Sequence, residues 1–150
     1  MLSEDASLMT RDELLAFLRR HRLGVLATVT PAGEPESAVV GVAFTDRLEV
    51  VFDTLGNTRK VQNLRKNPKI AFVVGWDEEI TVQLEGFADE PTGAELIRLK
   101  DDYFAVYPDG RERQSWPGIT YFRMRPHWAR YSDFNSQGKI VEFTADELKI

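Results

Sequence analysis

Cysteine is absent from the 150 residues of this sequence. Its absence excludes disulfides, thiolate catalysis and zinc or iron–sulfur sites built on cysteine. Histidine occurs only at His21 and His127, so we expect no histidine-rich site and predict no metal centre. A Ser-His-Asp arrangement, a Walker loop and a GxGxxG motif are also missing, and the sequence assigns no catalytic residue.

Long apolar runs are missing as well. No segment approaches the roughly 18 apolar residues that a membrane-spanning helix needs, and the N-terminal stretch MLSEDASLMTRDELL is acidic and unlike a signal peptide. We therefore expect a cytoplasmic protein with no membrane partner. The net charge of −5 gives the chain no general attraction to nucleic acid or anionic lipid, so any basic site must be local.

The composition that is present belongs to a folded domain. Apolar residues make up 43% of the chain and charged residues 29%, a balance typical of globular rather than disordered proteins. A chain of 150 residues corresponds to about one domain. We expect a single domain that spans residues 1–150.

Hydrophobic periodicity predicts helices at 10–22, 58–66 and 92–107, and strands at 23–30, 36–45, 48–54, 69–76, 79–90 and 119–134. The segment 36–45 is apolar on both faces, which predicts a central strand in an antiparallel meander with its two neighbours. Pro126 is expected to bend the last strand, and 108–118 to form a polar loop. Strands with so few helices between them favour a closed or partly closed antiparallel barrel, because a parallel sheet needs a helix after nearly every strand.

The stretch TLGNTRKVQNL, residues 54–64, places an unusual cluster before the second predicted helix. Thr58 is a suitable N-cap. Arg59 and Lys60 add two positive charges at a helix end that the dipole already makes positive, which is mildly unfavourable. A bound phosphate would reverse that effect, because helix N–H groups, hydroxyls, arginine and lysine all bind phosphate. A solvated surface is the alternative explanation of the same charges.

The pattern TxxxTRKxxNLxxNP at 54–68, followed by Trp76 and the strand LEGFA at 84–88, resembles the flavin-binding split-barrel family of pyridoxamine 5′-phosphate oxidase. The resemblance runs from about Thr10 to Asp133 and is closest to the short, general-stress-protein-like branch. It implies a mainly β fold: an antiparallel Greek-key split barrel with flanking α-helices. The barrel core would cover about 10–133 and a C-terminal tail 134–150. It also implies a homodimer with FMN bound at the interface.

Matched by position, the resemblance implies cofactor contacts at four places. The phosphate would be held by Thr58, Arg59 and Lys60, the ribityl chain by Asp53 and Thr54, and the isoalloxazine edge by the backbone of Val39, Val40, Gly41 and Val42; Thr81 stands where the oxidase has a flavin-contacting glutamine, and Gln83 is a nearby substitute. Gly41 suits a close approach of the backbone to a flat ring, and a bulge or packing glycine is the alternative explanation.

Two departures from the oxidase bear on the substrate. Ala38 and Ala43 stand where the oxidase has an arginine and a lysine, and no Arg-x-His-x-Arg element follows the last strand. A phosphorylated substrate would lose most of its ion pairs here. The resemblance therefore implies an FMN-dependent oxidoreductase with a small-molecule substrate other than pyridoxamine 5′-phosphate. Three alternatives stay open: a deazaflavin in the same site, haem in the same fold, and a non-catalytic flavin-binding module.

Overall fold

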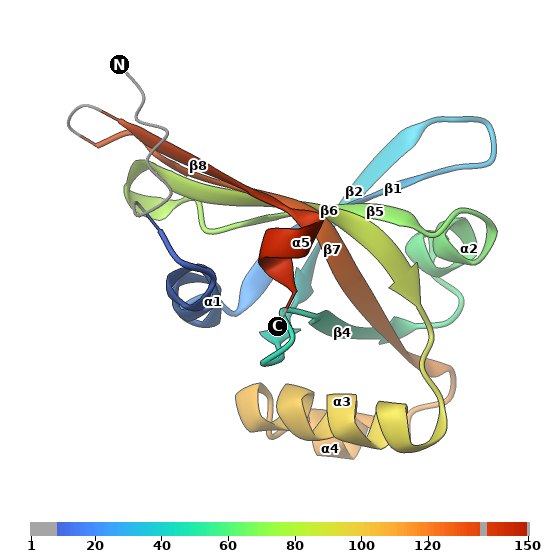
Figure 1. Ribbon diagram of the computed structural model, residues 1–150. Helices are drawn as coiled ribbons and strands as arrows, with labels where there is room; N and C mark the ends of the chain where they lie inside the picture. Colours follow the sequence, from blue (N-terminus) through green and yellow to red (C-terminus); the bar gives the residue numbers. More distant parts are fainter. Residues whose placement is uncertain (1–8, 136–137, 150) are drawn as a thin grey trace.

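The computed structural model describes residues 9–135 and 138–149. Its main feature is a curled sheet of eight strands with helices packed at its sides (Figure 1). The strands are β1 (Leu23–Val29), β2 (Pro35–Gly41), β3 (Ala43–Phe44), β4 (Val50–Leu55), β5 (Lys69–Val74), β6 (Ile80–Asp89), β7 (Ile119–Asp133) and β8 (Lys139–Thr144). The helices are α1 (Arg11–Arg19), α2 (Arg59–Lys66), α3 (Gly93–Val106), α4 (Gly110–Arg113) and α5 (Ala145–Leu148), with a 3₁₀ turn at Asp77–Glu79. The strand pairings are antiparallel, which confirms the predicted mainly β split barrel with flanking helices.

The order of the strands explains why the sheet curls. It runs β2-β1-β5-β6-β7-β4-β3, with β8 paired to β7. The two ends of this order, β2 and β3, are separated in the chain by Val42 alone. The sheet must therefore curl until its ends meet, and this closes one end of a barrel. Away from that junction the β1–β2 hairpin extends past the barrel (Figure 1).

The prediction of one central strand over 36–45 is wrong. The segment divides at Val42, whose N–H donates to the Arg22 carbonyl oxygen at 2.9 Å and whose side chain is fully buried. β2 forms an edge of the sheet, and its outward Val39 is 61% exposed. β4 pairs with β7 and β3 rather than with β2, so the predicted meander reduces to two separate hairpins.

Two apolar cores lie on the two faces of β4. Val50 and Phe52 point into the barrel, where Phe52 stacks on Phe122 with ring centroids 5.6 Å apart. Val51 points the other way and packs with Tyr103 of α3. This alternation is the period-2 rule of a strand that is covered on both sides. It fixes which face each neighbouring residue of β4 can reach.

The bend predicted at Pro126 takes the form of a β-bulge. The register shifts between Glu85 and Gly86 of β6, and this leaves His127 of β7 as the extra residue. At the shift the two strands come very close. A Cβ atom on Gly86 would lie 2.2 Å from the carbonyl oxygen of Arg125 and 2.9 Å from the Cα of Pro126. Only glycine fits there without moving the backbone.

We expect Gly86→Ala to lower the free energy of unfolding by about 1–3 kcal/mol, because the added methyl group meets rigid backbone atoms. The measurement is the midpoint of urea unfolding. Gly33→Ala separates the two possible causes, since the space around Gly33 is empty and its positive φ of 85° alone opposes a side chain; its loss, about 1 kcal/mol, measures backbone strain without a clash. Gly86→Ala with wild-type stability would contradict the close approach of the two strands.

The long strand β7 organises the rest of the molecule. Its first part pairs with β4 and its last part with β8, while β6 pairs with it on the other side from Arg123 to Asp133. The short helix α4 lies within 108–118, which the sequence analysis predicts as a polar loop. Within the described ranges, no helix has both the length and the apolar character required to cross a membrane.

Candidate cofactor site

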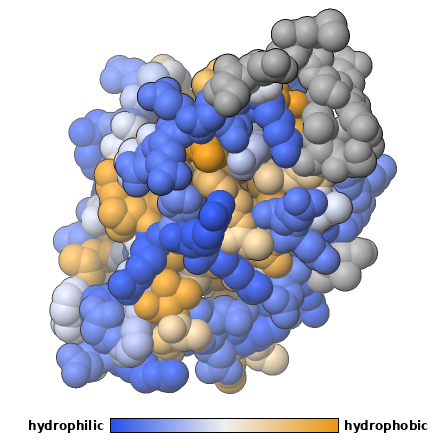
Figure 2. All heavy atoms as spheres, turned by 90° about the vertical axis from the view of Figure 1, so that its left-hand side faces the viewer, coloured by the Kyte–Doolittle hydropathy of each residue, from blue (hydrophilic) through white to orange (hydrophobic). Residues whose placement is uncertain are grey.

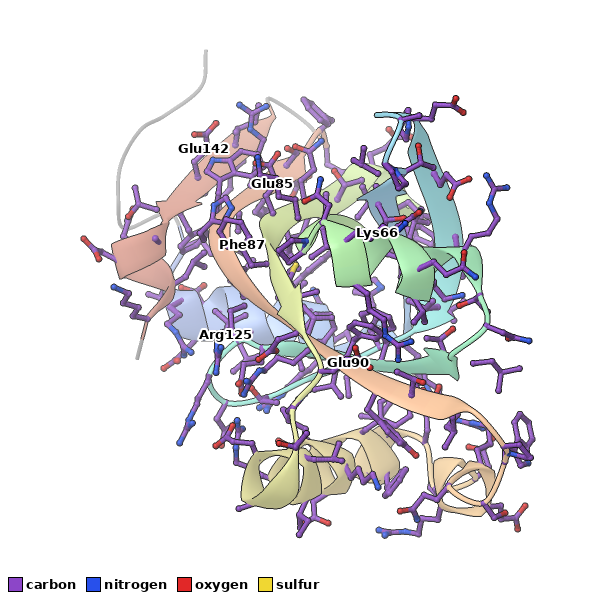
Figure 3. The ribbon with its side chains drawn as sticks, turned by 90° about the vertical axis from the view of Figure 1, so that its right-hand side faces the viewer. Lys66, Glu85, Phe87, Glu90, Arg125 and Glu142 are labelled. Atoms are coloured by element: carbon purple, nitrogen blue, oxygen red, sulfur yellow. The ribbon has the colours of Figure 1, made fainter. Side chains whose placement is uncertain are left out.

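A cavity of about 550 Å³ lies between the β1–β2 hairpin and the start of α2. Figure 3 shows α2 beside this hairpin, with Lys66 marking the opposite, C-terminal end of the helix. The volume of the cavity falls within the range of small-molecule sites, roughly 300–1,000 Å³. The hairpin supplies one wall because alternate residues of paired strands share a face. The lining consists of Leu26, Thr28, Glu36, Ser37, Ala38, Asn57, Thr58, Arg59 and Lys60.

The N-terminus of helix α2 faces this cavity with its backbone N–H groups. Thr58 occupies the N-cap position with extended backbone angles, as predicted. Its side chain, however, does not cap the helix: the hydroxyl donates to the Leu55 carbonyl oxygen at 2.8 Å and lies 3.4 Å from the hydroxyl of Thr54. The first-turn N–H groups are therefore left without a side-chain acceptor among the described residues, which suits an anion.

Two cations stand at this helix end. The Arg59 side chain is 80% exposed and forms an ion pair with Glu36 across the cavity. Lys60 is half-buried, and desolvation alone lowers the pKa of its ammonium group. No carboxylate in the described part of the chain offsets that desolvation. An ammonium group that has lost water without gaining a counter-charge is stabilised by a bound anion.

Glu36 is held in place by a buried amide. Its Oε1 accepts a hydrogen bond of 2.7 Å from Nδ2 of Asn63, a side chain of α2 that is 5% exposed. The same Nδ2 donates to the Thr28 hydroxyl at 3.0 Å. The sequence predicts no role for Glu36 or Thr28, and Asn63 appears there only within the family pattern at 54–68. A usable signal was the i, i+4 spacing of Arg59 and Asn63, which puts both on one face of α2.

The structure brings together the three residues expected at the phosphate, Thr58, Arg59 and Lys60, which all line the cavity. Asp53 and Thr54 point to opposite faces of β4. Thr54 is buried beside Thr58. Asp53 lies on the α3 side of the sheet, where its carboxylate does not line the cavity.

The carboxylate of Asp53 has its own partners there. It accepts from the Tyr103 hydroxyl at 2.8 Å and from Nε of Arg113 at 3.1 Å. Burial is the main reason why the pKa of Tyr103 is raised above its ordinary value, and the charge of Asp53 adds to it. These contacts fasten α3 and α4 to β4.

The four residues expected along an isoalloxazine edge differ in their surroundings. Val40 and Val42 are buried in the barrel core, whereas Val39 points outward. A Cβ atom on Gly41 would lie 2.8 Å from Cζ of Tyr107, so this glycine accommodates the tyrosine ring. That contact matches the packing explanation of Gly41 given above.

Thr81 and Gln83 lie on β6, away from the cavity. The register runs Val39–Val25–Val73–Gln83 across β2, β1, β5 and β6, so all four side chains share the outer face of the sheet. Three strand spacings separate Val39 from Gln83, or roughly 14 Å. Within the described residues, no group of three or more histidine, aspartate or glutamate side chains is placed to hold a metal ion.

Comparison with known proteins identifies the family. The family model described as Pyridoxamine 5′-phosphate oxidase matches residues 10–133, most of the chain. The chain belongs to the pyridoxamine 5′-phosphate oxidase family. The matched range ends with β7 and includes every residue that lines the cavity.

Two relatives illustrate the range of this family. A pyridoxine/pyridoxamine 5′-phosphate oxidase of Rubrobacter xylanophilus is 36% identical over 93 residues, which cover 61% of this chain and 41% of the relative. A 5a,11a-dehydrotetracycline/5a,11a-dehydrooxytetracycline reductase of Streptomyces rimosus is 24% identical over 140 residues, which cover 89% and 92% of the two chains. The matches span between 41% and 51% of the length of the first two oxidases.

Two solved structures share the fold. A haem-binding protein from Mycobacterium smegmatis superposes with a TM-score of 0.79 and 17% identity, over 93% of this chain and 60% of that chain. A pyridoxamine 5′-phosphate oxidase-related, FMN-binding protein from Nostoc punctiforme superposes with a TM-score of 0.61 and 14% identity, over 82% and 80% of the two chains. By their descriptions, one of these two proteins of the same fold binds haem and the other binds FMN.

Proposed function

We propose that this protein is an FMN-binding oxidoreductase whose substrate is a small molecule other than pyridoxamine 5′-phosphate. The observation that carries the proposal is the cavity at the start of α2. Arg59, the desolvated Lys60 and the first-turn N–H groups of α2, which have no side-chain cap among the described residues, converge there on a space of about 550 Å³. This donor set suits a phosphate group at one end of a flat cofactor.

The lining of the cavity favours a flavin over haem. Haem iron is bound by histidine, cysteine, methionine or tyrosine side chains, and none of these residue types is among the lining residues. A deazaflavin carries phosphate as well and fits the same donors. The near full-length similarity to a reductase supports redox chemistry, and the FMN-binding protein with the same fold supports the flavin.

The substrate side of the proposal rests on two alanines. Ala38 lines the cavity, where the oxidase has an arginine, and adds no charge for a second phosphate. Ala43 is 2% exposed and packs in the core beneath α3. Neither position can bind a phosphorylated substrate electrostatically.

We further propose that two copies of the chain enclose the cofactor. The outer face of the sheet carries three large apolar side chains that are about half exposed or more: Leu23 at 49%, Val39 at 61% and Phe87 at 50%. Val25 and Val73 lie half-buried between them, and the labelled Phe87 marks this face in Figure 3. Exposed apolar surface of this kind is typical of protein interfaces. On the face that carries α1, by contrast, hydrophilic side chains separate the apolar patches (Figure 2).

The chemistry divides between cofactor and protein. A bound flavin supplies electron transfer, and the protein supplies binding, orientation and electrostatics. Arg59 and Lys60 would bind the phosphate, and the Thr58 hydroxyl would donate to it after turning from the Leu55 carbonyl oxygen. The partner copy would cover the outer face of the sheet, which includes Val39 and Gln83.

Native mass spectrometry of the purified protein tests the proposal directly. We expect two chains with two FMN molecules, and an absorption spectrum with the paired bands of a flavin. A single near-ultraviolet band together with the mass of a deazaflavin would identify a deazaflavin in place of FMN. A Soret band would identify haem. A protein that binds FMN but reduces no acceptor with any electron donor would be a binding module. A ligand-free monomer that takes up no flavin would refute the proposal.

A further inference from the structure

Glu36 places a negative charge inside the cavity that the proposed function assigns to a phosphate group. Its carboxylate lines the cavity and pairs with Arg59, one of the two phosphate-binding cations. Only 18% of its side chain is exposed. A phosphate that binds Arg59 must therefore compete with a carboxylate that is already there.

The buried amide of Asn63 prevents Glu36 from moving away freely. Nδ2 of Asn63 donates one hydrogen to Thr28 on β1 and the other to Glu36 on β2. Asn63 is itself 5% exposed, and its helix is anchored in the core by Val61 and Leu64. The carboxylate is thus fixed by a contact that does not involve Arg59, and it stays near the phosphate position when Arg59 turns to a ligand.

The charges at the site then decide which ligands are favoured. Arg59 and Lys60 contribute two positive charges and Glu36 one negative charge, which leaves one positive charge for the ligand. A phosphate monoester carries about 1.5 to 2 negative charges at neutral pH, whereas a phosphate diester carries one. Like charges a few ångströms apart in a partly desolvated site repel each other strongly.

We propose that Glu36 is a specificity-determining residue: it weakens the binding of a doubly charged phosphate monoester relative to a singly charged diester. This inference rests on the proposed function. It predicts that FMN binds reversibly, with an affinity that the carboxylate limits.

The test uses three ligands with the same ring system and different phosphate charge. They are riboflavin, the monomethyl ester of FMN, and FMN, whose affinities are measured by flavin fluorescence quenching at neutral pH. In Glu36→Gln we expect FMN to bind at least about tenfold more tightly, the methyl ester by a smaller factor, and riboflavin unchanged. Glutamine keeps an acceptor for Asn63, so the variant should retain the wild-type unfolding midpoint.

Glu34→Gln is the matched control. It removes one negative charge from the exposed turn of the same hairpin, outside the cavity lining, and is expected to leave all three affinities unchanged. An FMN-to-riboflavin affinity ratio in Glu36→Gln that equals the wild-type ratio would overturn the inference. A lower ratio would also overturn it, since Glu36 would then help by orienting Arg59. If neither the wild type nor Glu36→Gln binds any of the three flavins, the proposed function is refuted instead.

Discussion

The double variant Arg59→Ala/Lys60→Ala is expected to bind FMN roughly 30- to 5,000-fold more weakly than the wild type, a loss of about 2–5 kcal/mol. The reason is the removal of two charge-assisted contacts to the phosphate. Lys60 should contribute strongly, because desolvation lowers the pKa of its ammonium group in the absence of a ligand. Isothermal titration calorimetry with FMN and riboflavin measures the effect, which should be confined to FMN.

The other end of the same helix provides the control. Arg65→Ala/Lys66→Ala removes the same total charge from exposed positions at the C-terminus of α2, where Arg65 pairs with Glu90. FMN binding should be unchanged in this variant, so a loss in both double variants would point to long-range charge rather than to contacts. Full flavin occupancy in purified Arg59→Ala/Lys60→Ala would refute the phosphate assignment.

The parts of the fold that the sequence predicts well are those with local signals. The helix predicted from residue 10 begins there as α1, with a capping box in which Oγ1 of Thr10 accepts from the N–H of Glu13. The division of the segment 36–45 at Val42 has no such signal. A run that is apolar on both faces fits a central strand, and it equally fits a strand that leaves one edge of a sheet and enters the opposite edge. Only closure of the barrel, a contact between distant strands, decides between the two.

The candidate site shows the same contrast between local signals and long-range contacts. Thr58, Arg59 and Lys60 are contiguous, so any helix that begins there gathers them at one end. The direction of Asp53 depends instead on Tyr103 and Arg113, which lie 50 and 60 positions away in the chain. Such contacts follow from how α3 and α4 pack on the sheet, which periodicity does not report.

Glu36 is the most consequential residue that the sequence left unassigned. In the hairpin its side chain alternates with exposed residues and has the pattern of an ordinary surface charge. Its role depends on Asn63, 27 positions later, which reaches across from α2. A residue that opposes the charge of its own site is visible only when both elements are placed together.

Arg123→Met is expected to lower the free energy of unfolding by about 3 kcal/mol. Arg123 lies on β7 with 5% of its side chain exposed, and it donates to Asp89, Glu49 and Glu95. Methionine fills a similar space but leaves the buried Glu49 with less compensation for its charge. Arg98 of α3 still donates two hydrogen bonds to Glu49, at 2.9 and 3.0 Å, which keeps the cost near the lower end of that for a broken buried pair.

Arg130→Met is the control on the same strand. Arg130 pairs with Glu142, but its side chain is 40% exposed, and exposed pairs contribute little to stability. Urea unfolding at neutral pH should give a clearly lower midpoint for Arg123→Met and an unchanged one for Arg130→Met. Equal midpoints for the two variants would mean that the buried network adds nothing beyond an exposed pair.

Acid should narrow the difference between Arg123→Met and the wild type. Burial raises the pKa of Glu49, but hydrogen bonds from Arg98 and Thr45 and the nearby guanidinium charges outweigh it and hold this pKa below its ordinary value. Hydrogen bonds from Arg98 and Arg123 lower the pKa of Glu95 to about 2. A carboxyl with a depressed pKa stabilises the fold above its unfolded pKa, about 4.3, and this contribution is lost as the pH falls through the folded value. In Arg123→Met the carboxylates contribute less of this stabilisation, so acid removes less of it than in the wild type. The unfolding free energies of Arg123→Met and the wild type should therefore converge below about pH 4. A difference that stays constant down to about pH 3 would show that Arg123 acts through packing rather than through its charge on the carboxylates.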